Sequence, residues 1–129
     1  MATKNILQIP IYKKAMDLCF MSREIASCVT LNKNLLTLYE SNSLRDSIAN
    51  SLLTDTILIP QKIVIAEFSK SSSERMSSIS FINIMIKNIN SYCLGLEKDG
   101  VKETEYLHLL RSEIRSFRKH YKKWKISIN

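Results

Sequence analysis

Along most of the chain, apolar residues recur every three or four positions, which is the spacing of one face of an α-helix. The first such run predicts a helix over residues 10–29. Pro10 suits its first turn, because the amide N–H that proline lacks would have no helical partner there. The apolar positions of this run are Ile11, Ala15, Leu18, Ile25 and Val29.

The second run predicts a helix that starts at residues 41–43, where serines suit an N-cap, and reaches Ala66. Residues 30–42 read as a polar connection whose leucines we expect to pack in part. Pro60 lies inside the second run and removes one helical hydrogen bond, so we expect a kink there. The alternative is two shorter helices that meet at Ile59 and Pro60.

A serine-rich break at residues 69–73 precedes the third run, and Ser71 followed by Glu74 fits a capping box. The third helix is predicted to reach Leu96, with Gly100 as its stop. Its apolar arc covers roughly 220°, about twice the width that a surface helix needs. The extra width fits either deep burial in its own bundle or contact with another subunit. The residues that widen the arc, and that form a candidate oligomer interface, are Phe81, Met85 and Tyr92.

The fourth run predicts a helix that begins at residues 102–104 and ends near Lys125. Its apolar residues alternate by three and four positions, as in the seam of a helical bundle. Four long helices with short connections indicate an all-α, up-down-up-down four-helix bundle. We expect one domain over residues 1–129, with a flexible N-terminus over residues 1–8. The seam residues are Leu107, Leu110, Ile114, Phe117, Tyr121 and Trp124.

Composition supports this fold class and locates the charge. The chain has 129 residues, the size of one domain, and only two glycines and two prolines, fewer turn-forming residues than β-rich folds need. Its formal charge of +7 is concentrated in one segment, since residues 111–125 hold seven Lys and Arg residues and one acid, Glu113. Six of these cations fall on one flank of the fourth helix, within about 120° of arc. This basic stripe comprises Arg111, Arg115, Arg118, Lys119, Lys122 and Lys125.

The sequence carries few signals for catalysis. With its two glycines, the sequence has no phosphate-binding loop of the GxGxxG or Walker type. No CxxC pair occurs, and His108 and His120 lie on different faces of the fourth helix, so we expect no metal site. The three cysteines suit a reducing cytosol, and we find neither an apolar leader nor a run of about 20 apolar residues. We therefore expect a cytoplasmic protein that is not an enzyme, is not attached to a membrane and needs no cofactor.

The basic stripe is the feature of the sequence that points to a function. Six cations on one flank create a positive field that attracts phosphate groups over a long range. Contact with the backbone of RNA or DNA, without sequence readout, is one interpretation. A solvated helical face, an acidic protein partner and a membrane surface are the alternatives. Tyr121 and Trp124 lie nearby and could stack on unpaired bases, but their seam positions predict that they pack in the core.

The segment IPIYKKAMDLCFMSREI at residues 9–25 resembles the first helix of the four-helix-bundle proteins encoded in intervening sequences of bacterial large-subunit ribosomal RNA. It is similar also to the accessory variability determinant of diversity-generating retroelements, which shares that fold. The second helix of this family carries an isoleucine–proline step followed by Ile-Ala-Glu, and here Ile59 and Pro60 are followed by that triplet at residues 65–67. The triplet lies further from the proline than in the family, and Phe68 stands where the family has glycine.

The resemblance covers about residues 9–126 and implies a homopentamer with a central channel. For the retroelement branch it also implies a basic surface that binds nucleic acid and a complex with a reverse transcriptase. We therefore expect a non-catalytic nucleic-acid-binding accessory subunit that contacts RNA or DNA through the basic stripe. The alternative is a structural protein–protein interaction bundle of the ribosomal RNA intervening-sequence type, whose members have no settled activity.

Overall fold

The computed structural model describes residues 5–128, and every regular element in that range is helical. The all-α class predicted from the sequence is therefore confirmed. Residues 5–128 contain five α-helices rather than four, because the connection predicted over residues 30–42 contains a short helix of its own. The elements are the 3-10 helix η1 (Ile6–Gln8) and the α-helices α1 (Pro10–Val29), α2 (Leu35–Glu40), α3 (Leu44–Phe68), α4 (Ser72–Lys98) and α5 (Thr104–Ile128).

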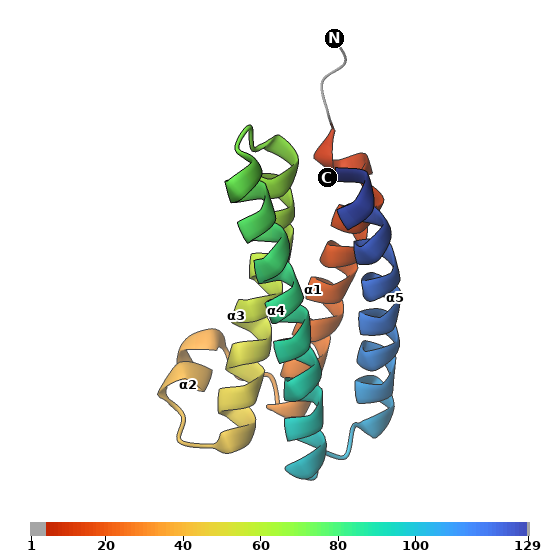
Figure 1. Cartoon of the computed structure of the whole chain (residues 1–129). Coiled ribbons are helices and arrows are strands. Elements are labelled where there is room, and N and C mark those ends of the chain that lie inside the picture. The colour runs from red at the N-terminus through yellow and green to blue at the C-terminus, as the bar shows by residue number, and fades with distance from the viewer. Residues whose placement is uncertain (1–4, 129) are drawn as a thin grey trace.

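The four long helices lie side by side, and the short α2 lies outside this group, beside the start of α3 (Figure 1). Helix α3 packs most extensively on α4, whereas α1 packs on both α3 and α5. Helix α2 packs against α3, and Leu38 is its one buried residue. The helix η1 and the last turn of α5 lie at the pole of the molecule opposite α2. Residues 1–4, part of the segment expected to be flexible, lie outside the described residues.

Serine side chains cap the two helices at the centre of the chain, as the sequence predicted, but the N–H of Ser71, which a full capping box would pair with Glu74, bonds Ser69 Oγ at 3.2 Å. Ser43 Oγ accepts the N–H of Asp46 at 3.3 Å and so caps α3. Ser71 Oγ accepts the N–H of Glu74 at 3.2 Å and so caps α4. Each bond satisfies one of the amide groups that a helix N-terminus leaves without a partner.

The end of α4 depends on Gly100, the predicted stop. Its φ of 80° lies in the left-handed region, which glycine adopts without steric cost. The N–H of Gly100 bonds the carbonyl of Glu97 at 3.0 Å, and the N–H of Val101 bonds that of Leu96 at 3.3 Å. These two bonds satisfy carbonyls at the end of α4 and turn the chain towards α5.

Helix α3 continues through Pro60 as one helix, so the alternative of two shorter helices is wrong. Proline has no N–H to donate to the carbonyl of Thr56, one turn earlier. That carbonyl instead accepts the thiol of Cys19 from α1, with Sγ 3.1 Å from the oxygen. Burial raises the pKa of the Cys19 thiol, so the thiol keeps its proton at neutral pH. A side chain of the neighbouring helix thus replaces the hydrogen bond that Pro60 removes.

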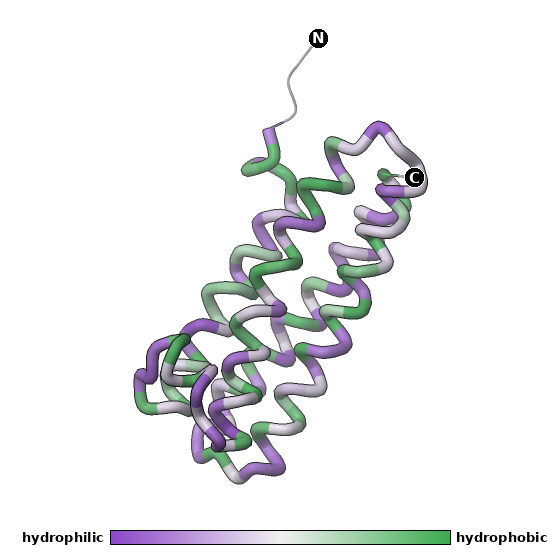
Figure 2. Tube along the Cα trace, turned by 90° about the vertical axis from the view of Figure 1, so that its left-hand side faces the viewer, coloured by the Kyte–Doolittle hydropathy of each residue, from purple (hydrophilic) through white to green (hydrophobic). Residues whose placement is uncertain are grey.

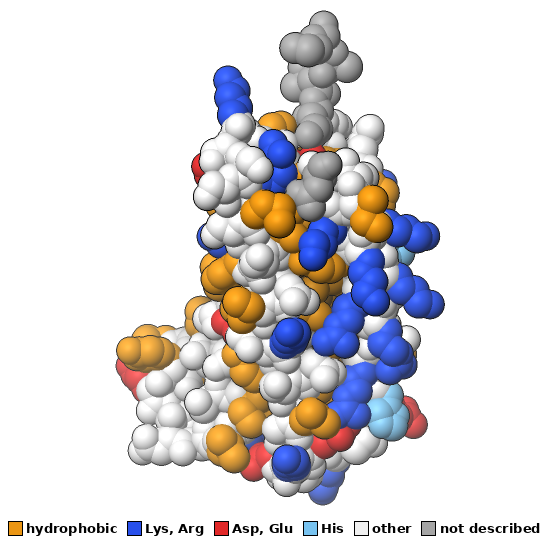
Figure 3. Space-filling model, viewed as in Figure 1, with side chains coloured by type: hydrophobic (Ala, Val, Ile, Leu, Met, Phe, Trp, Pro, Cys, Tyr) orange, Lys and Arg blue, Asp and Glu red, His pale blue; other side chains and the backbone are white. Residues whose placement is uncertain are grey.

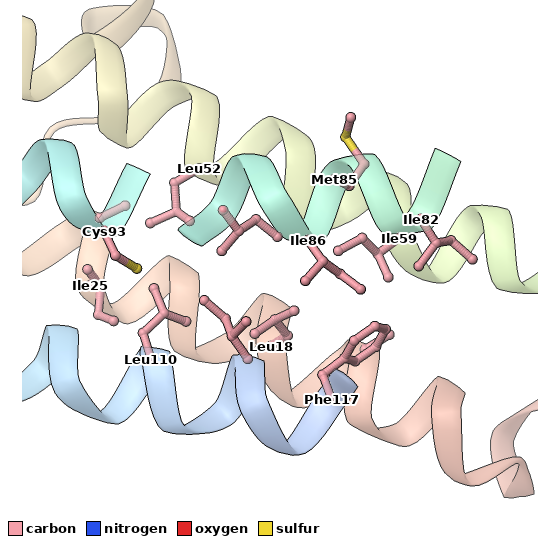
Figure 4. Packing of buried hydrophobic residues seen from close by; sticks show 14 of the residues in the cluster. Leu18, Ile25, Leu52, Ile59, Ile82, Met85, Ile86, Cys93, Leu110 and Phe117 are labelled. Carbon is pink, nitrogen blue, oxygen red and sulfur yellow. The ribbon is translucent and has the colours of Figure 1, made fainter. Parts of the chain in front are cut away.

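The core is one continuous cluster along the line where the long helices meet (Figure 4). Ile59 of α3, Ile86 of α4 and Phe117 of α5 belong to it and are shielded from solvent. Apolar and polar positions are interspersed along the helices in Figure 2, and they separate onto opposite faces in α5 and α1 but not in α3. The seam predicted for the last helix is confirmed, since all six of its residues are buried.

By length and composition alone, α3 could cross a membrane, although the sequence has no unbroken run of about 20 apolar residues and no span was expected. The difference arises because α3 carries many apolar residues that are interrupted by a few polar ones. Leu52, Ile59 and Ile63 of this helix are fully buried. Packing against α1 and α4 accounts for the third of its most apolar stretch that is buried, whereas Ile57 and Ile65 on the same helix remain 47% and 36% exposed.

Candidate nucleic-acid interface

Helix α5 separates apolar from basic residues more sharply than the other long helices do. Its apolar seam faces the core, and the basic stripe follows the flank beside α4. In Figure 3, Lys and Arg side chains gather along this side of the molecule. Exposed members of the stripe are Arg115, Lys119, Lys122 and Lys125, whereas Arg111 and Arg118 are half-buried.

A groove of about 440 Å³ lies between α4 and α5, and we call it the basic groove. Arg118, Lys122 and Lys125 line its α5 side, and Asn83 and Lys87 line its α4 side. Lys87 was not among the predicted site residues. It belongs to a different helix from the stripe, and only the packing of α4 beside α5 brings the two together. No periodicity within a single helix could have signalled it.

Most cations around the basic groove have no acidic partner. Within residues 5–128, the one ion pair that involves the stripe joins Arg111 Nη1 to Glu97 Oε1 at 2.6 Å. Unpaired cations that share a surface repel one another, and a bound polyanion relieves that repulsion. The cations that form no ion pair in this range are Lys87, Arg115, Arg118, Lys119, Lys122 and Lys125.

Arg111 differs from the rest of the stripe. Its guanidinium is half-buried, with Nη1 paired to Glu97 of α4. Its Nη2 is buried and has no hydrogen-bond partner in the part of the chain that the structure describes. A guanidinium held in this way offers little to a phosphate outside. We therefore interpret Arg111 as a link between α5 and α4, and the other five stripe residues as the candidate phosphate contacts.

Tyr121 and Trp124 lie in the core, as their seam positions predicted, with 6% and 7% of their surface exposed. The hydroxyl of Tyr121 donates to the carbonyl of Ile79 at 2.8 Å, and burial raises the pKa of this phenol. The indole N–H of Trp124 donates to Glu67 Oε1 at 2.6 Å. Both polar groups are therefore occupied, and although Tyr121 also lines the basic groove, too little of either ring is exposed for face-to-face stacking on a base.

The residues predicted to form an oligomer interface lie on the flank of α4 that faces α3. The hydroxyl of Tyr92 donates to Asp55 of α3, and Lys62 Nζ of α3 lies 4.8 Å from the centroid of the Phe81 ring. Met85 is buried and points away from α5 (Figure 4). Contacts within the chain thus account for much of the wide apolar arc of α4. The role of these three residues between subunits stays a prediction.

Metal ligands do not gather in residues 5–128, where no three His, Cys, Asp or Glu side chains lie close enough together to hold an ion. Glu105 and His108 on α5 have the spacing of one ligand pair in bundle metal sites, and both are exposed without a third ligand beside them. His120 is half-buried, and its Nδ1 lies 2.9 Å from the carbonyl of Ser116. The surface beside α5 therefore offers positive charge as its distinctive chemistry.

Comparisons with protein-family models, with curated proteins and with solved structures gave no match for this chain. The resemblance seen in the sequence stays an expectation, and the charges around the basic groove are the observation that bears on function.

Proposed function

We propose that the chain is a non-catalytic, cytoplasmic accessory subunit that binds the phosphate backbone of RNA or DNA. One observation carries this proposal: cations from two helices meet around the basic groove, and no carboxylate lines it. Lys87 comes from α4, and Arg118, Lys122 and Lys125 come from α5. Such a cluster costs electrostatic free energy in the isolated protein and favours an anionic ligand.

A polyanion suits this surface better than a single small anion. From Arg115 to Lys125 the stripe extends for on the order of 15 Å, given the helical rise per residue. A nucleic acid places several phosphates over that length. Each phosphate that a cation contacts releases condensed counterions, so binding weakens as the salt concentration rises.

Recognition through this surface reads the backbone and not the bases. Lysine and arginine contacts to phosphates position a nucleic acid without distinguishing its sequence. Tyr121, which lines the basic groove, and Trp124 are only 6% and 7% exposed, so they offer little ring face for the stacking that single-strand binders use. The proposed subunit therefore binds without sequence preference.

We also propose the finer architecture, an up-down-up-down four-helix bundle with α2 as an insertion and a kink in α3 at Pro60. The arrangement of the long helices in Figure 1 supports the bundle, and the missing N–H of Pro60 supports the kink. A homo-oligomer, pentameric by resemblance, repeats the basic groove and raises avidity for a long polyanion. The same resemblance makes a reverse transcriptase of a diversity-generating retroelement the proposed protein partner.

A structural protein–protein interaction bundle is the second candidate, and α2 favours it. Leu35, Leu36 and Tyr39 on this helix are 52%, 66% and 76% exposed, and clustered apolar side chains in solvent mark contact surfaces. The ultraviolet spectrum of the purified protein separates the two candidates. Co-purified RNA, seen as excess absorbance at nucleic-acid wavelengths, supports the first and argues against a purely structural role.

Charge reversal in the stripe tests the proposed function. We expect Arg115→Glu combined with Lys122→Glu to weaken binding of a labelled RNA or DNA oligonucleotide about tenfold at low salt, because two attractive contacts become repulsive. The slope of log affinity against log salt should fall in magnitude by about 2, since each phosphate contact contributes slightly less than one counterion. Fluorescence anisotropy titrations at several salt concentrations measure both quantities.

The matched control is Lys13→Glu combined with Lys70→Glu, which changes the net charge equally at exposed positions outside the stripe. We expect this control to keep most of its affinity and its salt slope. Equal losses in the two double variants would show that net charge alone attracts the nucleic acid. Unchanged binding by the stripe variant at low salt would contradict the proposed function.

A further inference from the structure

A second groove, between α1 and α5, has a volume of about 490 Å³, and we call it the acidic groove. Phe20 and Met21 of α1 and Tyr106 and Leu109 of α5 supply its apolar surface. Phe20, Tyr106 and Leu109 are 55%, 49% and 55% exposed. Arg23 lies over the Phe20 ring, with Cζ 5.8 Å from the ring centroid. Large apolar side chains that converge from two helices and remain half in solvent indicate an interaction surface.

The charged residues that line this groove are all acidic. Asp17 and Glu24 of α1 and Glu113 of α5 belong to it, and its lining includes no lysine or arginine. Of these three carboxylates, only Glu113 forms an ion pair within residues 5–128, with Lys14 Nζ at 3.5 Å. In a chain of net charge +7, a lining with three carboxylates and no cation contrasts with the basic stripe, although Lys14 and Arg23 lie beside it.

The walls of the acidic groove restrict what can occupy it. Both walls are α-helices, whose backbone groups already bond within the helix and cannot pair with an added strand. An occupant must therefore be recognised through side chains, which an amphipathic helix presents at spacings of three, four and seven residues. From Asp17 to Cys28 the α1 wall extends for on the order of 16 Å, which is room for about three turns of a helix.

We propose that the acidic groove docks a cationic amphipathic helix of a partner protein. Apolar residues of that helix pack on Phe20, Tyr106 and Leu109, and its lysines or arginines lie beside Asp17 and Glu24. The basic stripe on the other flank of α5 repels the same helix, so the two charges direct it to one side of the molecule. This inference does not depend on nucleic-acid binding.

A model peptide tests the proposal on the full chain. The probe is a fluorescein-labelled peptide of leucine and lysine that forms a helix with one apolar face. We expect saturable binding with a Kd below about 100 μM in an anisotropy titration. A scrambled peptide of the same composition, which has no apolar face as a helix, should bind about tenfold more weakly, because it cannot place leucines in the groove.

Two variants locate the binding. Leu109→Lys removes an apolar contact, and Asp17→Lys combined with Glu24→Lys reverses the rim charge, so each should weaken the probe about tenfold. All three positions are exposed, so the circular dichroism of the variants should match that of the unmodified chain. The control Leu36→Lys, on α2 outside the groove, should bind as tightly as the unmodified chain. Absence of saturable binding, or binding that both groove variants leave unchanged, overturns the proposal.

Discussion

Asp46, in the first turn of α3, is a buried side chain with 2% of its surface exposed. Its Oδ2 accepts hydrogen bonds from Lys33 Nζ at 2.5 Å and from Ser41 Oγ at 2.8 Å. Burial by itself raises the pKa of a carboxyl, but these bonds and the charges of Lys33 and Arg45 outweigh burial and hold the pKa of Asp46 below its usual value. The ionised carboxylate thereby holds the connection between α1 and α3, which includes α2, against the start of α3.

This residue makes stability depend on pH in a defined direction. Because the folded-state pKa of Asp46 lies below 3.8, its contribution is present above that pH and is lost as pH falls through the folded-state value. We expect Asp46→Asn to lower the free energy of unfolding by about 1–3 kcal/mol at neutral pH. Urea unfolding from neutral to strongly acidic pH checks this. A difference from the unmodified chain that stays constant down to the most acidic pH would count against it.

Trp124 gives a second prediction at the scale of one residue. It is the single tryptophan of the chain, it is 7% exposed, and its N–H is bonded to Glu67. A base cannot reach this ring, so we expect intrinsic fluorescence to change little when the basic groove is saturated with RNA. Titration with single-stranded homopolymers should also give similar affinities for each base. Strong quenching at saturation would show that the helices rearrange or that a base stacks on Trp124.

At the scale of elements, α1 and α3 are joined by more than apolar contact. Pro60 leaves the buried carbonyl of Thr56 without its helical donor, and the thiol of Cys19 supplies the missing bond across the interface. A buried carbonyl without a donor costs free energy comparable to a lost hydrogen bond. The two helices are therefore matched at this point by a specific polar contact.

A double-mutant cycle measures the energetic coupling between the Cys19 thiol and Pro60. Cys19→Ala should destabilise the chain by about 1–3 kcal/mol, because it opens a small cavity and leaves the Thr56 carbonyl without a hydrogen-bond donor. In the background of Pro60→Ala, a backbone N–H becomes available to that carbonyl. Cys19→Ala should then cost about 1 kcal/mol less, as measured by urea unfolding.

Cys93→Ala serves as the control for this cycle, since Cys93 is also a buried cysteine but lies on α4. Its cost should be the same with proline or alanine at position 60. Additive energies for the Cys19 and Pro60 substitutions would mean that the thiol does not replace the missing helical bond.

At the scale of the whole molecule, α5 divides two surfaces of opposite charge. Its flank beside α4 carries the basic groove, and its flank beside α1 carries the acidic groove. The polyanion and the cationic helix that we propose as ligands would therefore bind to different flanks of α5 and would not compete for one site. Under the proposals made above, the protein would bring a nucleic acid and a protein partner to two sides of one helix.

The sequence predicted features that depend on one helix at a time. Capping serines, the stop at Gly100 and the apolar seam of α5 follow from local chemistry and periodicity, and they are confirmed. The contribution of Lys87 to the basic groove and the pairing of Arg111 with Glu97 depend on which helices are neighbours and how they are rotated. Periodicity does not contain that information, because tertiary packing sets it.

Because two of the cysteines are buried, the rate of thiol alkylation measures how often the folded chain opens. Cys19 and Cys93 lie in the core, and burial raises the pKa of Cys93 to about 11, whereas Cys28 is half-exposed. An alkylating reagent can reach Cys28 in the native chain, but it reaches the other two only when helices separate, since the thiolate is the reactive form. The slow phase of alkylation therefore reports how often α1 and α4 open, without any engineered label.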